Sequence, residues 1–111
     1  MSLDVENEDK DMIDACIHWI HKGEQMANVL SILNSESMNS GEIKKSIHRK
    51  YQNNAITQRS VIRIINSFVR VGLAKEKPKY DIPGTCTWYV LTELGALVQK
   101  ELERQRKNTG E

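Results

Sequence analysis

Hydrophobic positions repeat with the period of an α-helix along most of the chain. Ile13, Cys16, Ile17 and Ile20 follow the i, i+3, i+4, i+7 spacing of a helix that buries one face, and a helix is predicted over 9–22. A second run of the same period predicts a helix over 24–34. Because the glycine between the two runs costs only about 1 kcal/mol inside a helix, one kinked helix and two separate helices both remain open.

A third helix is predicted over 41–51 and a fourth over 58–71. Ser40 is the expected N-cap of the third helix, since a serine hydroxyl accepts hydrogen bonds from the free N–H groups of a helix start. Thr57 is expected to cap the fourth helix in the same way. Gly72 follows that helix, where a left-handed C-terminal cap is needed.

The period changes after Gly72. The stretch "LAKEKP" alternates small or apolar residues with charged ones, as a half-exposed strand does, and "CTWYVL" is rich in β-branched and aromatic residues. Pro83-Gly84 between them is a strong turn signal. A two-stranded hairpin is therefore predicted over 73–91, with 73–78 paired to 86–91.

A last helix is predicted over 93–106, with Thr92 as its N-cap. The acidic start, residues 1–8, is expected to be disordered, and the tail 107–111 is expected to be frayed. The chain then forms one domain over 9–106, mainly α with a small β-hairpin, an α+β fold. Three helices followed by a two-stranded hairpin are the layout of a winged helix-turn-helix, here with an extra N-terminal helix and a C-terminal helix.

Charge is divided sharply along the chain, although the formal net charge is only +1. Residues 1–36 carry eight acids and two bases, residues 37–80 carry ten bases and two acids, and residues 81–111 carry five acids and four bases. A basic middle segment attracts polyanions such as nucleic acids. No apolar run approaches the ~20 residues of a membrane-spanning helix and the start lacks the pattern of a signal peptide, so a cytoplasmic protein is expected.

The predicted helix 58–71 has a broad apolar half and a narrow basic band. At about 100° per residue, Arg59, Arg63, Asn66 and Arg70 fall within about 60° of one another, and no acid occurs on this helix. A solvated face usually mixes signs, because like charges one turn apart repel. The apolar half is formed by Val61, Ile62, Ile64, Ile65, Phe68, Val69 and Val71.

This helix is therefore the candidate to enter a DNA major groove. Arginine forks onto guanine O6 and N7 and asparagine onto adenine N6 and N7, whereas lysines supply point charges for phosphates. The expected base-reading residues are Gln58, Arg59, Ser60, Arg63 and Asn66. The expected phosphate-binding residues are Lys44, Lys45, Arg49, Thr57, Arg70, Lys75, Lys77 and Lys79.

Three stretches are similar to motifs of one group of proteins. They are "SGEIKKSI" (40–47), "RVGLAKEK" (70–77) and "WYVLTELG" (88–95). The first resembles the second-helix motif of PadR proteins, the second the end of a recognition helix with the first wing strand, and the third the "Y-x-LT-x-x-G" junction from the wing to the final helix. Over about residues 24–98 the chain thus resembles winged-helix transcriptional regulators of the MarR and PadR type. The resemblance implies a homodimer on a roughly palindromic double-stranded DNA operator.

The helices at the two ends of the chain are the expected dimer seam. The predicted helix 9–22 is more similar to the leading dimerisation helix of MarR proteins than to any standard PadR feature. The wing lacks the usual arginine near its tip, and no ligand-pocket residue carries over, so a small-molecule effector is left open. The expected dimer residues are Met12, Ile13, Trp19, Ile20, Leu94, Leu97 and Leu102. The alternative is that these side chains only close the core of the monomer.

Catalysis and metal binding find no support in the sequence. A glycine-rich phosphate loop and the GxSxG and HExxH motifs do not occur in it. His18 and His21 lie three residues apart on a helix, but Cys16 belongs to its core side, so a metal site is set aside. Cys86 is expected to be packed in a strand. We therefore expect no enzyme activity, no metal and no cofactor.

The expected function is sequence-specific double-stranded DNA binding by a dimeric transcriptional regulator, with helix 58–71 in the major groove and the wing on the backbone. The rival is a winged helix that serves as a protein–protein interaction module in a larger complex, since a fold alone does not settle function. Such a module has no need for unpaired arginines stacked on its third helix, and this favours DNA.

Overall fold

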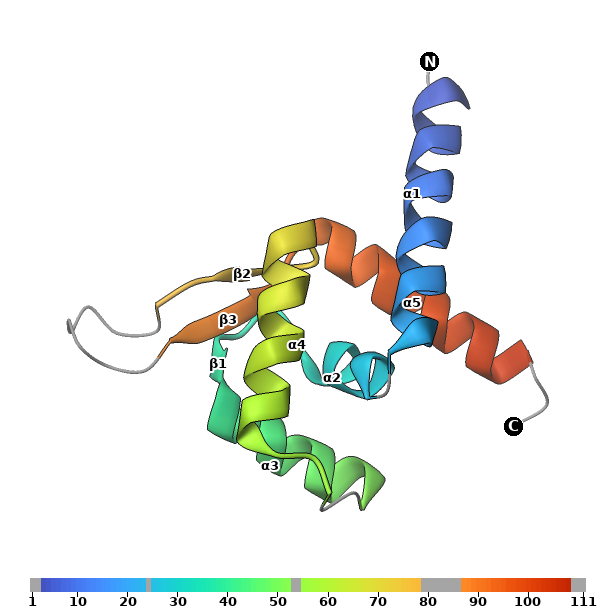
Figure 1. The fold of residues 1–111 in the computed structure, drawn as a ribbon. Coiled ribbons are helices and arrows are strands. Elements are labelled where there is room, and N and C mark those ends of the chain that lie inside the picture. The colour runs from blue at the N-terminus through green and yellow to red at the C-terminus, as the bar shows by residue number, and fades with distance from the viewer. Residues whose placement is uncertain (1–2, 24, 53–54, 79–86, 109–111) are drawn as a thin grey trace.

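The computed structural model describes residues 3–23, 25–52, 55–78 and 87–108. The chain is mainly helical, with a small antiparallel sheet at one side (Figure 1). In chain order the elements are α1 (Leu3–Lys22), α2 (Met26–Ile32), β1 (Met38–Asn39), α3 (Ser40–Tyr51), α4 (Gln58–Val71), β2 (Ala74–Glu76), β3 (Trp88–Leu91) and α5 (Glu93–Asn108).

Helix α1 is longer than the sequence pattern predicts. It begins at Leu3, so most of the acidic segment 1–8 is helical and the expectation of disorder there is wrong. The expectation took acidic composition as a sign of disorder, whereas acidic residues near the start of a helix are in general compatible with its dipole. Ile17 and Ile20 near the other end are buried in the core, whereas the N-terminal half of α1 extends beyond the rest of the molecule (Figure 1).

Helices α1 and α2 are separate. A β-carbon at Gly23 would lie 2.1 Å from the sulfur of Met26, so any other residue here would displace the Met26 side chain. Gln25 adopts a left-handed conformation with φ 71°, and α2 begins directly after it. The helix is therefore shorter than the predicted span 24–34.

Helix α3 is capped by Asn39 and not by Ser40, which is its first helical residue. The Asn39 side chain accepts a hydrogen bond from the Glu42 backbone N–H at 2.9 Å, and the Glu42 carboxylate accepts one from the Asn39 N–H at 3.3 Å. This reciprocal arrangement satisfies two backbone donors at once, which a serine one position later would not do.

The two strands predicted by the sequence pair as expected. Ala74 lies opposite Leu91 and Glu76 opposite Tyr89 in antiparallel register, and the Lys77 N–H extends the ladder to the Trp88 carbonyl at 2.9 Å. The predicted tip of the hairpin lies outside the described residues.

Strand β1 is not predicted by the sequence pattern. Met38 and Asn39 pair with Tyr89 and Trp88, which places β3 in the middle of the strand order β1-β3-β2. The Ser37 hydroxyl donates to the Lys77 carbonyl at 2.8 Å and joins the same two regions. The sheet is thereby fastened to the start of α3.

A set of hydrogen bonds that we call the clasp, formed by Gly72, Leu73, Thr92 and Gly95, joins the end of α4 to the start of α5. The Thr92 hydroxyl caps α5, as predicted, by accepting from the Gly95 N–H at 3.0 Å, and it donates to the Gly72 carbonyl at 2.5 Å. The Thr92 N–H donates to the Leu73 carbonyl at 3.1 Å. A β-carbon at Gly95 would lie 2.0 Å from that carbonyl oxygen, so only glycine allows this approach.

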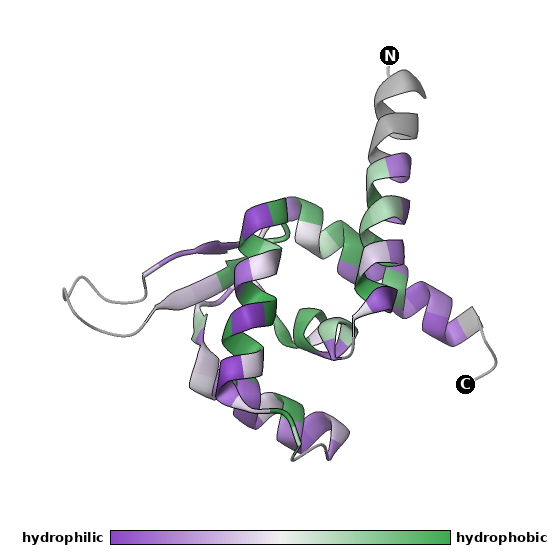
Figure 2. Ribbon diagram, viewed as in Figure 1, coloured by the Kyte–Doolittle hydropathy of each residue, from purple (hydrophilic) through white to green (hydrophobic). Residues whose placement is uncertain are grey.

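Gln99 fastens α5 to α2. Its side-chain amide donates to the carbonyl oxygens of Leu30 at 2.7 Å and Leu33 at 2.9 Å, at the end of α2. The Leu30 carbonyl also accepts the Leu33 N–H at 3.3 Å. After Leu102 the last turn of α5 is hydrophilic and largely exposed (Figure 2). The helix continues to Asn108, slightly past its predicted end at 106.

The core collects side chains from every helix. Fully buried residues include Ile20, Leu30, Ile43, Phe68 and Val98, one from each helix in turn. Within the described ranges, none of the helices combines the length and the apolar character that crossing a membrane would require.

Replacing Gly95 by alanine should lower the free energy of unfolding by ~1–3 kcal/mol, because the added methyl overpacks the clasp against backbone. Gly41→Ala is the matched control: its methyl would meet only the Asn39 side chain at 3.4 Å, and the helix gains up to about 1 kcal/mol from the exchange. Urea unfolding followed by circular dichroism compares the two. Equal stability of both variants would contradict the role assigned to Gly95.

Candidate nucleic-acid interface

Helix α4 is held at both ends by the caps that the sequence predicts. The Thr57 hydroxyl accepts from the Ser60 N–H at 3.1 Å at the start. Gly72 ends the helix in a left-handed conformation with φ 89°, and its N–H donates to the Val69 carbonyl at 3.3 Å. The bounds Gln58–Val71 agree with the predicted helix.

The inner side of α4 is anchored in the core. Val61, Ile65 and Phe68 are fully buried, and Ile64 nearly so. The Trp19 ring of α1 meets the Phe68 ring edge-on, with 6.0 Å between centroids and 74° between planes, a favourable aromatic geometry. This packing leaves α4 little freedom to rotate about its axis.

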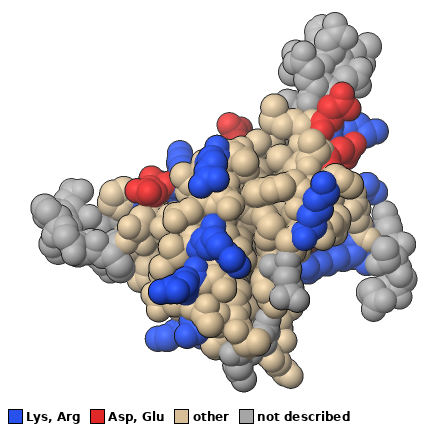
Figure 3. Space-filling model, in the orientation of Figure 1, with Lys and Arg blue, Asp and Glu red and all other residues tan. Residues whose placement is uncertain are grey.

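The opposite side of α4 carries what we call the arginine band: Arg59, Arg63, Asn66 and Arg70. All four side chains are exposed, and basic side chains gather over α4 on this face of the molecule (Figure 3). Within the part of the chain that the structure describes, no ion pair involves any of these arginines. The band therefore presents uncompensated positive charge to solvent.

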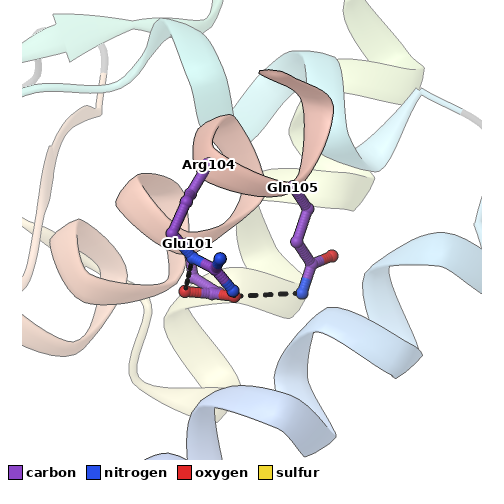
Figure 4. A network of polar contacts seen from close by, with 3 residues as sticks. All are labelled: Glu101, Arg104 and Gln105. Carbon is purple, nitrogen blue, oxygen red and sulfur yellow. Dashed lines mark hydrogen bonds and ion pairs between the residues drawn. The ribbon is translucent and has the colours of Figure 1, made fainter. Parts of the chain in front are cut away.

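An arginine on α5 shows the contrasting arrangement. Arg104 forms an ion pair with Glu101, and the same carboxylate accepts from the Gln105 amide at 3.1 Å (Figure 4). The pKa of Glu101 lies below its ordinary value because of the hydrogen bond from Arg104. The positive charge of Arg104 is thus paired with a carboxylate on its own helix, whereas the arginines of the arginine band have no such ion pair among the described residues.

Two of the predicted base-reading residues lie beside the band and are engaged elsewhere. The Gln58 amide donates to the Ser40 hydroxyl of α3 at 2.9 Å. Ser60 is part of the α4 cap, since its hydroxyl accepts from that of Thr57 at 3.1 Å. The structure therefore places Arg59, Arg63 and Asn66 on one side of α4. The side chains of Gln58 and Ser60 have hydrogen-bond partners within the chain, although Ser60 borders the same hollow as Arg63.

The basic residues of α3 are divided between two sides of that helix. Ser40, Lys44 and His48 succeed one another by one turn; Ser40 is bonded to Gln58, and the His48 ring lies 3.4 Å from the Ile56 carbonyl, so this side faces the start of α4. Lys45 and Arg49 border a different hollow of about 330 Å³ that also contains two acids, Glu36 and Glu42. Lys44 alone of the three predicted phosphate ligands shares a side with α4.

Lysines of the sheet lie beyond the other end of α4. Lys75 on β2 and Lys77 just after it are exposed, and the backbone of Lys77 is fixed by Ser37 and Trp88. Lys79, a further predicted phosphate ligand, lies outside the described residues. Thr57, also predicted to bind phosphate, has its hydroxyl in the helix cap.

The residues predicted for a dimer seam do not share one environment. Ile20 and Leu102 are buried in the core of the single chain, so that assignment is wrong for them. Ile13, Trp19 and Leu94 are partly buried against the same core. Met12 on α1 and Leu97 on α5 remain 50% and 47% exposed.

Ile62 differs from its predicted place. It was assigned to the apolar half of the helix, yet its side chain is 39% exposed, and Val71 on the other border of that half is 42% exposed. In projection Ile62 lies only about 40° from Asn66, so its border position is the signal that could have identified it. The buried part of α4 is narrower than the sequence pattern indicates.

The cysteines and histidines show no common site. Cys16 packs partly against the core, where burial raises the pKa of its thiol, and Cys86 lies outside the described residues. His18 and His21 are exposed on α1. Among the described residues, no group of three or more histidine, cysteine, aspartate or glutamate side chains is gathered as metal ligands would be.

Comparison of the chain with models of protein families, with curated proteins and with solved structures finds no match.

Proposed function

We propose that the chain is a winged helix-turn-helix protein that binds double-stranded DNA with sequence preference and acts as a homodimeric transcriptional regulator. In this assignment α2, α3 and α4 are the helical trio, α4 is the recognition helix, and β2 with β3 forms the wing. The order α2-β1-α3-α4-β2-β3 and the strand order β1-β3-β2 support it, because they place the wing directly after the helix that would enter the groove.

The arginine band is the observation that carries the proposal. It offers forked donors on the exposed side of a 14-residue helix that is capped at both ends and anchored by Phe68. An α-helix fits the major groove of B-DNA, where arginine and asparagine make two-pronged contacts to guanine and adenine. Arg59, Arg63 and Asn66 would read bases from the first turns of α4, and Arg70 near its end would meet a phosphate.

Phosphate contacts would come from both ends of α4. Lys44 lies on the side of α3 that faces the start of the helix, and Lys75 and Lys77 follow its end. Lys45 and Arg49, which share a hollow with two acids, contribute less to this surface. Contacts to the DNA phosphate backbone at two separated points set the position of a recognition helix along the groove.

The dimer would form through α1 and α5. The exposed side chains of Met12 and Leu97 lie on these two helices, which pack against each other. A twofold dimer places two copies of α4 on successive half-sites of a palindromic operator. The N-terminal half of α1, which extends beyond the core, is free to reach a second copy.

Arg63→Ala should lower the affinity for a selected duplex by ~1–3 kcal/mol and relax the preference at one base pair, because a two-pronged base contact is lost. Lys77→Ala should weaken binding to specific and random duplexes alike. Lys100→Ala, which removes one exposed charge from α5, is the control and should change neither. Fluorescence anisotropy with both duplexes measures the effects, and parent-like binding by both test variants would refute the assignment.

Affinity for DNA should fall steeply with salt, because each neutralised phosphate releases a counterion. A dimer with about seven phosphate contacts would lose about 10³-fold or more between 50 and 200 mM salt, with log K linear in log salt. The same anisotropy titration, repeated over a salt series, gives the slope. A chain that binds no duplex at low salt would point to the rival function, an interaction module within a protein complex.

Met12→Glu combined with Leu97→Glu should weaken dimerisation by about tenfold or more per site, because each change places a charge in a desolvated seam. Neither substitution touches the buried core, so the helical content should persist. Val71→Glu, at an exposed apolar residue on α4, is the control and should leave the dimer intact. Sedimentation velocity distinguishes the species; a double variant that still sediments as the parent dimer would exclude this seam.

A further inference from the structure

An isoleucine stands beside the polar residues on the exposed side of α4. Ile62 is 39% exposed although the same helix buries Val61, Ile64 and Ile65 in the core. It follows Arg59 by three residues and precedes Asn66 by four, and residues at these separations are neighbours on a helix surface. Ile62 therefore belongs to the same outward surface as the arginine band.

Arg59, Ile62, Arg63 and Asn66 have the spacing i, i+3, i+4, i+7. Homeodomains read the major groove with four residues of this spacing on one helix, because these positions form a single strip. Gln58 and Ser60, which the sequence pattern proposes in addition, fall outside the strip and are held by Ser40 and Thr57. The strip thus has three polar positions and one apolar position.

The major groove presents one apolar group to such a position. Every base pair offers hydrogen-bond donors or acceptors there, but only thymine adds a C5-methyl group. An isoleucine side chain can neither donate nor accept a hydrogen bond. It therefore discriminates between bases by contact with that methyl group or by disfavouring a polar base edge at this position. Desolvation of an exposed isoleucine against a methyl is favourable, whereas desolvation against a polar base edge is costly.

We propose that Ile62 is a specificity-determining residue that contacts the C5-methyl group of a thymine next to the bases reached by Arg59 and Asn66. This inference rests on the proposed DNA-binding function. It assigns to the operator a thymine in each half-site that no hydrogen-bonding side chain reads.

A thymine-to-uracil scan of the selected duplex tests the proposal. Uracil pairs as thymine does and lacks only the C5-methyl group, so each exchange removes one methyl and nothing else. We expect exchange of that one thymine in a single half-site to lower the affinity of the parent protein about fourfold, the ratio for one buried methyl group. Ile62→Ala should bind the thymine and uracil duplexes equally.

Val71→Ala is the matched control. Val71 is also exposed on α4, but on the border opposite Ile62, and this variant should keep the fourfold difference. The readout is a ratio of two affinities for one protein sample, so a partial loss of folded variant cancels from it.

The outcomes separate this inference from the function on which it rests. If the parent selects a sequence but no uracil exchange weakens binding, or if Ile62→Ala retains the difference, the role of Ile62 is refuted and DNA binding stands. If the parent enriches no sequence from a random pool, both the function and the inference are refuted.

Discussion

Burial of one side of α4 decides which side chains the opposite side of this helix presents to solvent. Phe68 and Ile65 are wholly inaccessible, and the Trp19 ring closes over Phe68 from α1. Rotation of the helix by one residue, about 100°, would carry arginine side chains toward this apolar core, where an unpaired charge is very costly. The outward direction of the arginine band is thus a result of core packing, and no contact to the band itself is needed to maintain it.

Both ends of α4 are also fastened to segments distant in sequence. Gln58 is tied to the first residue of α3, and the chain after Gly72 is enclosed by Thr92 and Gly95. Gln99 then connects α5 to the end of α2. The helix bearing the band is in this way fixed at both ends and along its buried side, and such preorganisation would lower the entropic cost of the proposed binding.

The features that could be predicted are those with local signals. The bounds and both caps of α4 follow from Thr57, a helical apolar period and Gly72, which all lie within or next to the helix. The cap of α3 was misplaced by one residue because asparagine and serine are almost equally good N-caps. Glu42, three residues after Asn39, is the sequence signal of a capping box that distinguishes the two. Strand β1 has two residues, too few to show alternation, and its partner lies about fifty residues later in the chain.

The candidate site was predictable in its centre and not at its edges. Arg59, Arg63 and Asn66 follow from helical geometry alone, whereas the engagement of Gln58 by Ser40 depends on how α3 crosses α4. An apolar helix stripe likewise does not reveal whether it meets its own chain or a second copy, and this is why Ile20 and Leu102 were misassigned. Ile62 was assigned to the buried side of α4 because the pattern records which residues are apolar. It does not show how much of the helix the neighbouring elements cover.

The position of β3 between β1 and β2 has a consequence for how the chain folds during synthesis. Neither outer strand pairs with the other, so both lack a partner until Trp88–Leu91 has left the ribosome. Helices α2, α3 and α4 pack on one another through contacts that are closer in sequence and can form earlier, whereas the sheet closes loops of very different length in one late step. The last quarter of the nascent chain therefore completes the structure, and a ribosome that stalls before it leaves two unpaired strands exposed.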